Sequence, residues 1–264
     1  MGVYRRAEEL AAAGETVALV TVTAVSGSAP RDPGATMLVR GDGSTAGTIG
    51  GGNVENLSRE AAVEAIEAGE SSTAEWELRP EGNTGMVCDG HMEVFINVLA
   101  GRRTLLIAGG GHIAVPLTEL AAAAGYDPVV IEDRAEYADP ERFHPDTTVH
   151  HTTPEEGFAA ATVTENTAVV VATRSSALDR RAAACGLRSD AFYVGAVASE
   201  RKAAHIREGL REEDGVPAET VADLHAPVGL DLGGDAPRSI TVSVLAEVEL
   251  EYNDATGDRL STGA

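Results

Sequence analysis

Cysteine is nearly absent from this sequence, and its scarcity excludes two kinds of site. Only Cys88 and Cys185 occur among the 264 residues, and they are too far apart to form a C-x-x-C pair. A disulfide framework and a zinc site are therefore not expected. The histidines show no H-E-x-x-H or similar spacing, so we predict no metal site.

Basic residues are also few. The chain has 20 arginines and lysines against 42 acidic residues, its formal net charge is -22, and Lys202 is the only lysine. Such a surface repels phosphate backbones and anionic lipid headgroups, so we expect neither nucleic acid nor a membrane as a partner. We interpret the acidic excess as a halophilic adaptation to a salty cytoplasm, in which repulsion between carboxylates is screened.

The sequence also lacks a long apolar run. It contains no uninterrupted apolar span of about 18 residues, and no basic segment followed by an apolar one stands at its start. These features predict a soluble, cytoplasmic protein.

The most informative stretch is residues 104–134, whose pattern predicts a strand, a glycine turn, a helix and a second strand with an acidic end. Three small residues occupy the positions of the G-x-G-x-x-G/A motif: Gly109, Gly111 and Ala114. Glu132 follows about 20 residues later, at the distance of the acid that contacts a ribose in dinucleotide-binding folds. This context favours a nucleotide-like ligand over a purely structural turn.

Each position of the motif has a physical reason. Gly109 allows the tight turn, Gly111 lets a pyrophosphate approach the backbone, and Ala114 lets the helix pack on the strand with its N-terminus facing the phosphates. His112 lies inside the same loop and is a further candidate ligand contact.

Strands alternating with helices continue after this stretch and predict a parallel sheet with helices on both faces. We expect an α/β protein in which an N-terminal mixed α+β domain, residues 1–101, precedes a Rossmann-like doubly wound domain, residues 102–252, and a frayed tail, residues 253–264. The expected elements of the second domain include strands at 147–150, 168–173 and 192–197 and helices at 154–161, 177–187 and 238–252.

Ligands of such sheets bind at the carboxyl ends of the strands. This rule places Arg174, Arg201 and Lys202 around one mouth, where these scarce cations would meet phosphate. Helix capping or pairing with surface carboxylates is the alternative.

The first domain carries three further candidates. Arg31 lies in a loop between two prolines and suits either an anionic ligand or a nearby carboxylate. Gly50, Gly51 and Gly52 end a strand and precede a helix, so their backbone amides either dock an anionic or planar group or serve a tight turn. Cys88, in a glycine-flanked loop, has the setting of an accessible thiol, whereas Cys185 is expected to be a small buried hydrophobe.

With these motifs in place, the sequence resembles the XdhC/CoxI family, the maturation factors of molybdenum hydroxylases such as xanthine dehydrogenase and carbon monoxide dehydrogenase. The resemblance covers nearly the whole chain. It is carried by GSAPRDPGATMLV at 27–39, GTIGGGNVE at 47–55, GMVCDGHMEVFI at 85–96, IAGGGHIA at 107–114, TR-x-x-x-x-D at 173–179, YVGAVASERK at 193–202 and LHAPVGLDLGGDAP at 224–237.

The resemblance implies binding of the molybdopterin (molybdenum) cofactor, in a mononucleotide or dinucleotide form, and its delivery to a molybdenum hydroxylase client. A cysteine desulfurase that supplies the terminal sulfur and a second copy of the chain are further candidate partners. In this picture the pterin is held between two glycine-lined surfaces, the turn at 109–114 takes the phosphate, and Glu132 meets a ribose or a polar edge of the pterin. Cys88 offers thiolate to molybdenum or lies beside the transferred sulfur. This is binding and delivery more than turnover.

Three positions depart from the family pattern. Asp89 stands where a second glycine usually follows the cysteine, Ser176 stands where a histidine is usual, and Ala236 stands where a threonine precedes Pro237. A role of that histidine in ligand or proton handling therefore does not carry over to this chain.

A different class of function uses the same turn. An NAD(P)-dependent oxidoreductase would place Glu132 on the ribose hydroxyls, and the glycine motif fits both hypotheses. His112 and His225 are the only evident candidates for a general acid in the second domain, which disfavours the oxidoreductase. A scaffold without a ligand is a third hypothesis, which the glycine runs disfavour.

Overall fold

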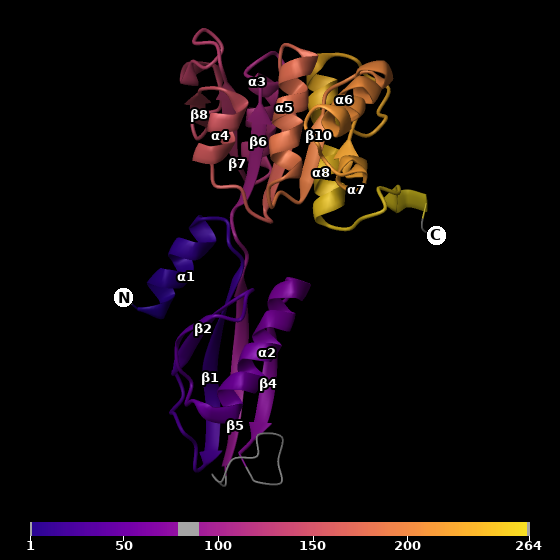
Figure 1. The fold of residues 1–264 in the computed structure, drawn as a ribbon. Coiled ribbons are helices and arrows are strands. Elements are labelled where there is room, and N and C mark those ends of the chain that lie inside the picture. Colours follow the sequence, from indigo (N-terminus) through magenta and orange to yellow (C-terminus); the bar gives the residue numbers. More distant parts are fainter. Residues whose placement is uncertain (1, 79–89, 263–264) are drawn as a thin grey trace. The chain divides into compact units, whose positions relative to one another are not determined.

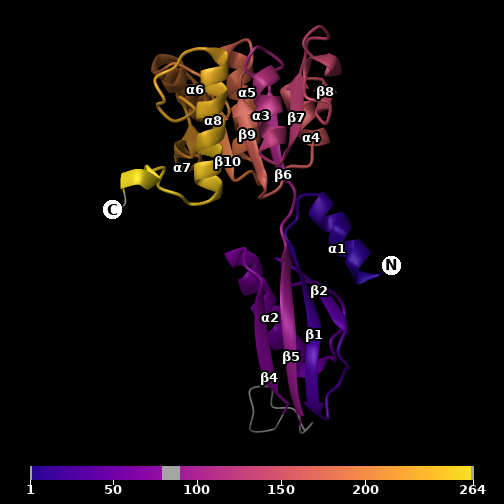
Figure 2. The same cartoon turned by 180° about the vertical axis from the view of Figure 1, so that it is seen from behind.

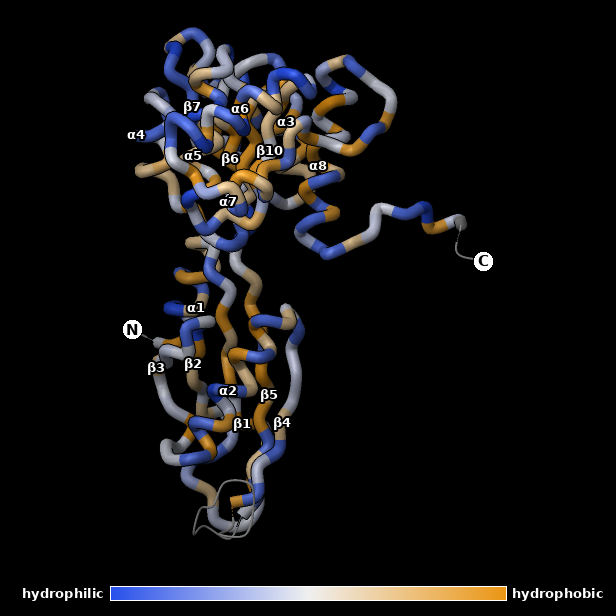
Figure 3. Tube along the Cα trace, turned by 45° about the vertical axis from the view of Figure 1, so that its right-hand side comes forward, coloured by the Kyte–Doolittle hydropathy of each residue, from blue (hydrophilic) through white to orange (hydrophobic). Residues whose placement is uncertain are grey.

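The computed structural model describes residues 2–78 and 90–262 and divides into two compact units, Met1–Arg102 and Arg103–Ala264 (Figure 1). In each unit the apolar residues concentrate along the strands and the polar ones along the outer turns and helices (Figure 3). No helix within the described ranges is long and apolar enough to cross a membrane.

The first unit is an antiparallel sheet with a helix on each face. Its elements are α1 (Val3–Ala12), β1 (Val17–Gly27), β2 (Thr36–Arg40), β3 (Thr45–Gly47), α2 (Gly52–Ala68), β4 (Ser72–Glu77) and β5 (Gly90–Leu99), and the strand order is β3-β2-β1-β5-β4. Alternate residues of β1 point to opposite faces. Ala18 and Val20 pack in the core beneath α2, whereas Val17 and Leu19 pack against α1.

The second unit is a parallel sheet covered on both faces. Its elements are β6 (Arg103–Ala108), α3 (Ala114–Ala123), β7 (Tyr126–Glu132), β8 (Thr148–His151), α4 (Pro154–Ala160), β9 (Thr167–Val171), α5 (Ser176–Leu187), β10 (Tyr193–Ala196), α6 (Glu200–Glu212), α7 (Ala218–Ala222), β11 (Leu224–His225) and α8 (Pro237–Tyr252). Short 3-10 turns cover Pro140–Arg142 and Leu260–Thr262. The order β11-β10-β9-β6-β7-β8 is that of a complete Rossmann sheet, with its switch point between β6 and β9.

The two faces of this sheet have separate cores. Leu105 and Ile107 of β6 face the layer that contains α3 and α8, whereas Leu106 and Ala108 face the layer that contains α5 and α6 (Figures 1 and 2). The predicted fold, a mixed α+β domain followed by a Rossmann-like doubly wound sheet, is confirmed.

Three elements were not predicted. The structure adds α6, α7 and the edge strand β11, and β11 pairs in parallel with β10. This addition matters for function because β11 ends at His225.

Candidate functional site

The glycine turn lies between β6 and α3, at the switch point of the Rossmann sheet. Gly109 has φ +115°, and a Cβ atom on it would lie 2.4 Å from the carbonyl oxygen of Ala172, so the end of β9 leaves room only for glycine. Gly111 differs, because a Cβ atom there would meet nothing within 4 Å. The turn is thus packed against protein at Gly109 and open at Gly111, the position that a phosphate is predicted to approach.

The glycine between them is anchored on three sides. The N–H of Gly110 donates to Oε2 of Glu132 at 2.8 Å, and its carbonyl accepts from Nη1 of Arg142 at 2.8 Å. A Cβ atom on Gly110 would lie 2.4 Å from the carbonyl oxygen of Tyr137. Contacts with the side chains of Glu132 and Arg142 and with the backbone of Tyr137 therefore set the conformation of the turn at Gly110.

Glu132 has less freedom than its predicted role requires. Its side chain is only 4% exposed. Besides the bond from Gly110, its carboxylate accepts from the backbone N–H of Arg134 at 3.1 Å and from Nε of the same arginine at 2.9 Å. The Arg134 guanidinium in turn lies over the ring of Tyr137, 3.8 Å from its centroid. Contact of Glu132 with a ribose or pterin stays a prediction, and it would have to compete with these bonds.

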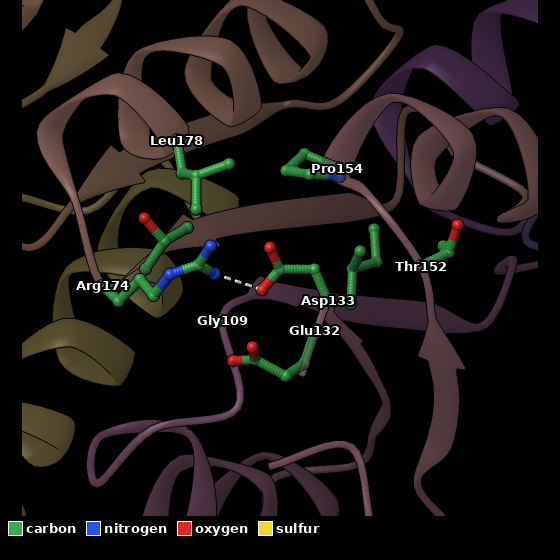
Figure 4. A pocket seen from close by; sticks show the side chains of 9 residues that line it. Gly109, Glu132, Asp133, Thr152, Pro154, Arg174 and Leu178 are labelled. Carbon is green, nitrogen blue, oxygen red and sulfur yellow. Dashed lines mark hydrogen bonds and ion pairs between the residues drawn. The ribbon is translucent and has the colours of Figure 1, made fainter. Parts of the chain in front are cut away.

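The crevice beside Glu132 is closed. Arg174 forms an ion pair with Asp133 across it (Figure 4), and this hydrogen bond lowers the pKa of the Asp133 carboxyl. The remaining cavity, lined also by Thr152 and Leu178, has a volume of about 10 Å³. That space holds about one water molecule, not a ribose.

The other predicted cations lie at the start of α6. Nζ of Lys202 is 2.5 Å from Oδ2 of Asp179, which is 1% exposed, and Oδ1 of Asp179 accepts from the Thr173 hydroxyl at 2.6 Å. Lys202 and Arg174 are thus both ion-paired, as the alternative to phosphate binding expects. Arg201 is exposed and has no side-chain partner within residues 2–78 and 90–262, so its contact with a ligand stays a prediction.

The glycines of the first unit lie in a hydrogen-bonded turn. Glu55, in the first turn of α2, accepts from the N–H groups of Gly51 at 3.0 Å and Ile49 at 3.2 Å and from the Thr48 hydroxyl at 2.5 Å. The Gly50 N–H donates to Thr48 at 3.1 Å. Burial alone would raise the pKa of Glu55, but these hydrogen bonds hold it below its usual value.

A carboxylate and a hydroxyl of the chain already accept from the amides of Gly50 and Gly51, which favours the alternative of a tight turn, and docking of a ligand there stays a prediction. A ligand contact at Gly52 stays a prediction. Pro30 packs on Gly50, where a Cβ atom would lie 2.5 Å from Cγ of the proline, and the exposed Arg31 follows it. The structure thus brings the Arg31 loop beside Gly50 of the first unit.

Of the two cysteines, only Cys185 lies among the described residues. Cys88 and Asp89 lie outside the described residues, so the thiol role of Cys88 stays a prediction. Cys185 of α5, expected to be buried, is only partly buried. Burial still raises the pKa of its thiol.

A polar cluster that the sequence did not reveal joins β10, β11 and α8. Glu247 accepts from the hydroxyl of Tyr193 at 2.5 Å and from the N–H of Gly229 at 2.7 Å, and its Oε1 lies 3.6 Å from Nδ1 of His225. Hydrogen bonding to Glu247 raises the pKa of His225. Burial would raise the pKa of Glu247 itself, but the bonds from His225, Tyr193 and Gly229 outweigh burial and lower it.

Two segments of the chain match known families. Residues 105–248 match the XdhC Rossmann domain, and residues 10–77 match the XdhC and CoxI family. The chain belongs to the XdhC/CoxI family. The resemblance drawn from the sequence motifs is confirmed, and the glycine turn of residues 109–114 lies inside the matched Rossmann domain.

Two curated proteins are related to this XdhC/CoxI chain. Uncharacterized protein YqeB of Escherichia coli K12 is 35% identical over 263 residues, which are 97% of this chain and 47% of that protein. A Bacillus subtilis 168 protein, named as a probable subunit of xanthine dehydrogenase, is 26% identical over 160 residues, 61% of this chain and 46% of that protein. The chain spans about half the length of these relatives.

The fold also matches a solved structure. A crystal structure described as a xanthine dehydrogenase from Bacillus halodurans has a TM-score of 0.51 and 18% identity, and the match covers 100% of this chain and 98% of that one. At this identity the match shows that the two proteins share their fold.

Proposed function

We propose that this XdhC/CoxI chain binds the molybdenum cofactor and delivers it to a molybdenum hydroxylase such as xanthine dehydrogenase or carbon monoxide dehydrogenase. Family membership supports the proposal, as do the names of the Bacillus subtilis relative and the Bacillus halodurans structure, both of which refer to xanthine dehydrogenase. A cysteine desulfurase and a second copy of the chain are proposed as further partners in the cytoplasm.

The observation that carries the proposal is the state of the glycine turn. Gly110 is hydrogen-bonded to Glu132 and Arg142, while a Cβ atom on Gly111 would meet no protein atom within 4 Å. A preformed turn at the start of a helix is suited to a phosphate group, because backbone N–H groups and the helix dipole favour negative charge there. The phosphate tail of the cofactor is the group we assign to it.

The chemistry proposed is binding and release. The cation Arg31 beside Gly50 and the thiol of Cys88 are further proposed contacts of the cofactor, the latter because soft thiolate suits molybdenum and sulfur transfer. The Thr173, Asp179 and Lys202 side chains are bound to one another and are assigned to holding the strand ends in place.

An NAD(P)-dependent oxidoreductase is the second candidate, because the strand order is that of dinucleotide-binding sheets. The small volume of the crevice beside Glu132 disfavours the oxidoreductase. A dinucleotide whose ribose sat near Glu132 would have to displace the pair of Asp133 and Arg174 from a space of about 10 Å³.

Cofactor analysis of the full-length protein tests the proposal. Protein purified anaerobically from a molybdate-supplied host should carry molybdenum and a pterin that oxidation converts to a fluorescent product. Gly111→Val should lose both without unfolding, since the backbone of Gly111 is not left-handed and an added Cβ atom meets nothing within 4 Å, and Gly111→Ala is the matched smaller change. Purified wild type should also activate an apo-xanthine dehydrogenase.

The contrary result is equally specific. Wild type without molybdenum or pterin that oxidises NAD(P)H with a small carbonyl compound, and loses this turnover in Gly111→Val, would replace the delivery hypothesis with the oxidoreductase.

A further inference from the structure

A ligand whose phosphate lies at Gly111 can extend from the glycine turn in two directions, and their sizes differ greatly. Toward β7 and β8 lies the crevice beside Glu132, with about 10 Å³. Toward α8 lies a groove of about 520 Å³ that begins at His112, the residue next to Gly111. Ligand pockets in proteins usually measure about 300–1,000 Å³, so only the groove has the size of a binding site.

The groove runs between the N-terminal turns of α3 and α8, which lie side by side on one face of the sheet (Figure 2). One wall is a single face of α3 and the loop before it, formed by His112, Val115, Pro116 and Glu119, and the other wall is Ala236, Pro237 and Arg238. Val115 and the two prolines give the walls apolar surfaces. A flat ring would fit between such walls, because it buries apolar area on both of its faces.

The groove carries one positive and one negative side chain, Arg238 and Glu119, and Arg238 suits an anionic group of a ligand. Arg238 is exposed, and its guanidinium has no partner among residues 2–78 and 90–262, in a chain with 42 acidic residues. An unpaired guanidinium stacks on planar rings and binds phosphate in a bidentate way. Glu119 adds an acceptor for ring N–H groups at the same groove.

We propose that this groove is the binding site for the planar ring of a phosphate-bearing pterin. The phosphate lies at the Gly111 amide, the ring lies between Val115 and Pro237, and Arg238 stacks on or pairs with the ligand. The site deepens the proposed function and rests on it. A ligand bound in this groove points away from the crevice beside Glu132, in which the adenosine of a dinucleotide would have to lie.

Two arginine substitutions in the full-length protein test this direction. The probe is the phosphate monoester of 6-hydroxymethylpterin. The fluorescence of its pterin ring reports binding. Arg238→Ala should weaken binding of the probe about tenfold. Arg174→Ala is the matched control: it removes a guanidinium from the crevice instead of the groove, and it should change the affinity for the probe less than twofold.

A second groove variant keeps the test independent of charge. Val115→Trp places a large side chain in the groove and leaves the residues of the glycine turn unchanged, and it should also weaken probe binding at least tenfold, while circular dichroism checks its folding. NADH serves as the nucleotide control and should bind wild type more weakly than the pterin.

Each result has a clear meaning. Unchanged affinity in both Arg238→Ala and Val115→Trp, with binding lost in Arg174→Ala, would overturn the groove and place the ring in the crevice, leaving the proposed function intact. Absence of pterin binding by wild type itself would overturn both.

Discussion

Replacing Gly110 by alanine should destabilise the second unit, whereas the same change at Gly111 should not. The added methyl group at position 110 would lie 2.4 Å from the Tyr137 carbonyl oxygen, about 1 Å short of ordinary contact, and 3.2 Å from Cβ of Glu132. The neighbour at 2.4 Å is backbone, so the turn has to move. Moving it lengthens the bond from the Gly110 N–H to the Glu132 carboxylate and the bond from Arg142 to the Gly110 carbonyl.

The size of the effect follows from these two losses. A hydrogen bond to a charged group contributes about 1.5–3 kcal/mol, and overpacking costs about 1–3 kcal/mol. Because both arise from one displacement they overlap, and we expect a loss of about 2–4 kcal/mol in the free energy of unfolding. At about 2–4 °C per kcal/mol for a unit of this size, its Tm falls by roughly 4–16 °C. Gly111→Ala has open space and should change stability by at most about 1 kcal/mol, in the stabilising direction.

Thermal unfolding of the full-length protein separates the two units. Trp76, the only tryptophan, lies in β4 of the first unit, so its fluorescence reports that unit, whereas far-UV circular dichroism reports both. Gly110→Ala should lower the Tm of one transition seen by circular dichroism and leave the Tm reported by Trp76 fluorescence unchanged. Equal Tm values for Gly110→Ala and Gly111→Ala would refute the anchoring described for Gly110.

Two further predictions concern titration and thiol reactivity. Hydrogen bonding to Glu247 raises the pKa of His225 above its ordinary value, so this pair stabilises the fold at low pH, and its contribution is lost as the pH rises through the raised pKa. Glu247→Gln should lower the pKa of His225 in an NMR titration. An unchanged pKa would contradict the pairing. Alkylation of the native protein should modify Cys88 before Cys185, whose thiol pKa is raised by burial, and bound cofactor should protect Cys88. Cys88→Ser should fold but retain less cofactor. Equal alkylation rates of the two thiols, together with full cofactor retention in Cys88→Ser, would remove Cys88 from the site.

The fold was predictable because burial on both faces leaves a strong local pattern. The run at 168–171 is buried at every position, which is how a central parallel strand reads in a sequence. Helix α6 was missed although Ala203, Ile206 and Leu210 have helical spacing, because charged residues surround them. Strand β11 has two residues and exists through its pairing with β10, so no local pattern could predict it.

The site was predictable only in part. The motif located the turn and its open glycine correctly, but no spacing rule shows that the Glu132 carboxylate turns back to Gly110, 22 residues earlier. Glu55 was closer to prediction, since it follows Gly51 by four residues and could have been recognised as a local acceptor. The bond between Tyr193 and Glu247 joins residues 54 apart and depends on how α8 packs on the sheet.

Because Gly110 is hydrogen-bonded at both its N–H and its carbonyl, this part of the turn is already ordered when a ligand arrives. Association with such a turn is governed by diffusion and charge rather than by loop closure. The same rigidity leaves the turn no movement of its own that could shorten the residence time of a cargo. In the proposed delivery, release from this site would therefore depend on competition from the acceptor rather than on a movement of the turn.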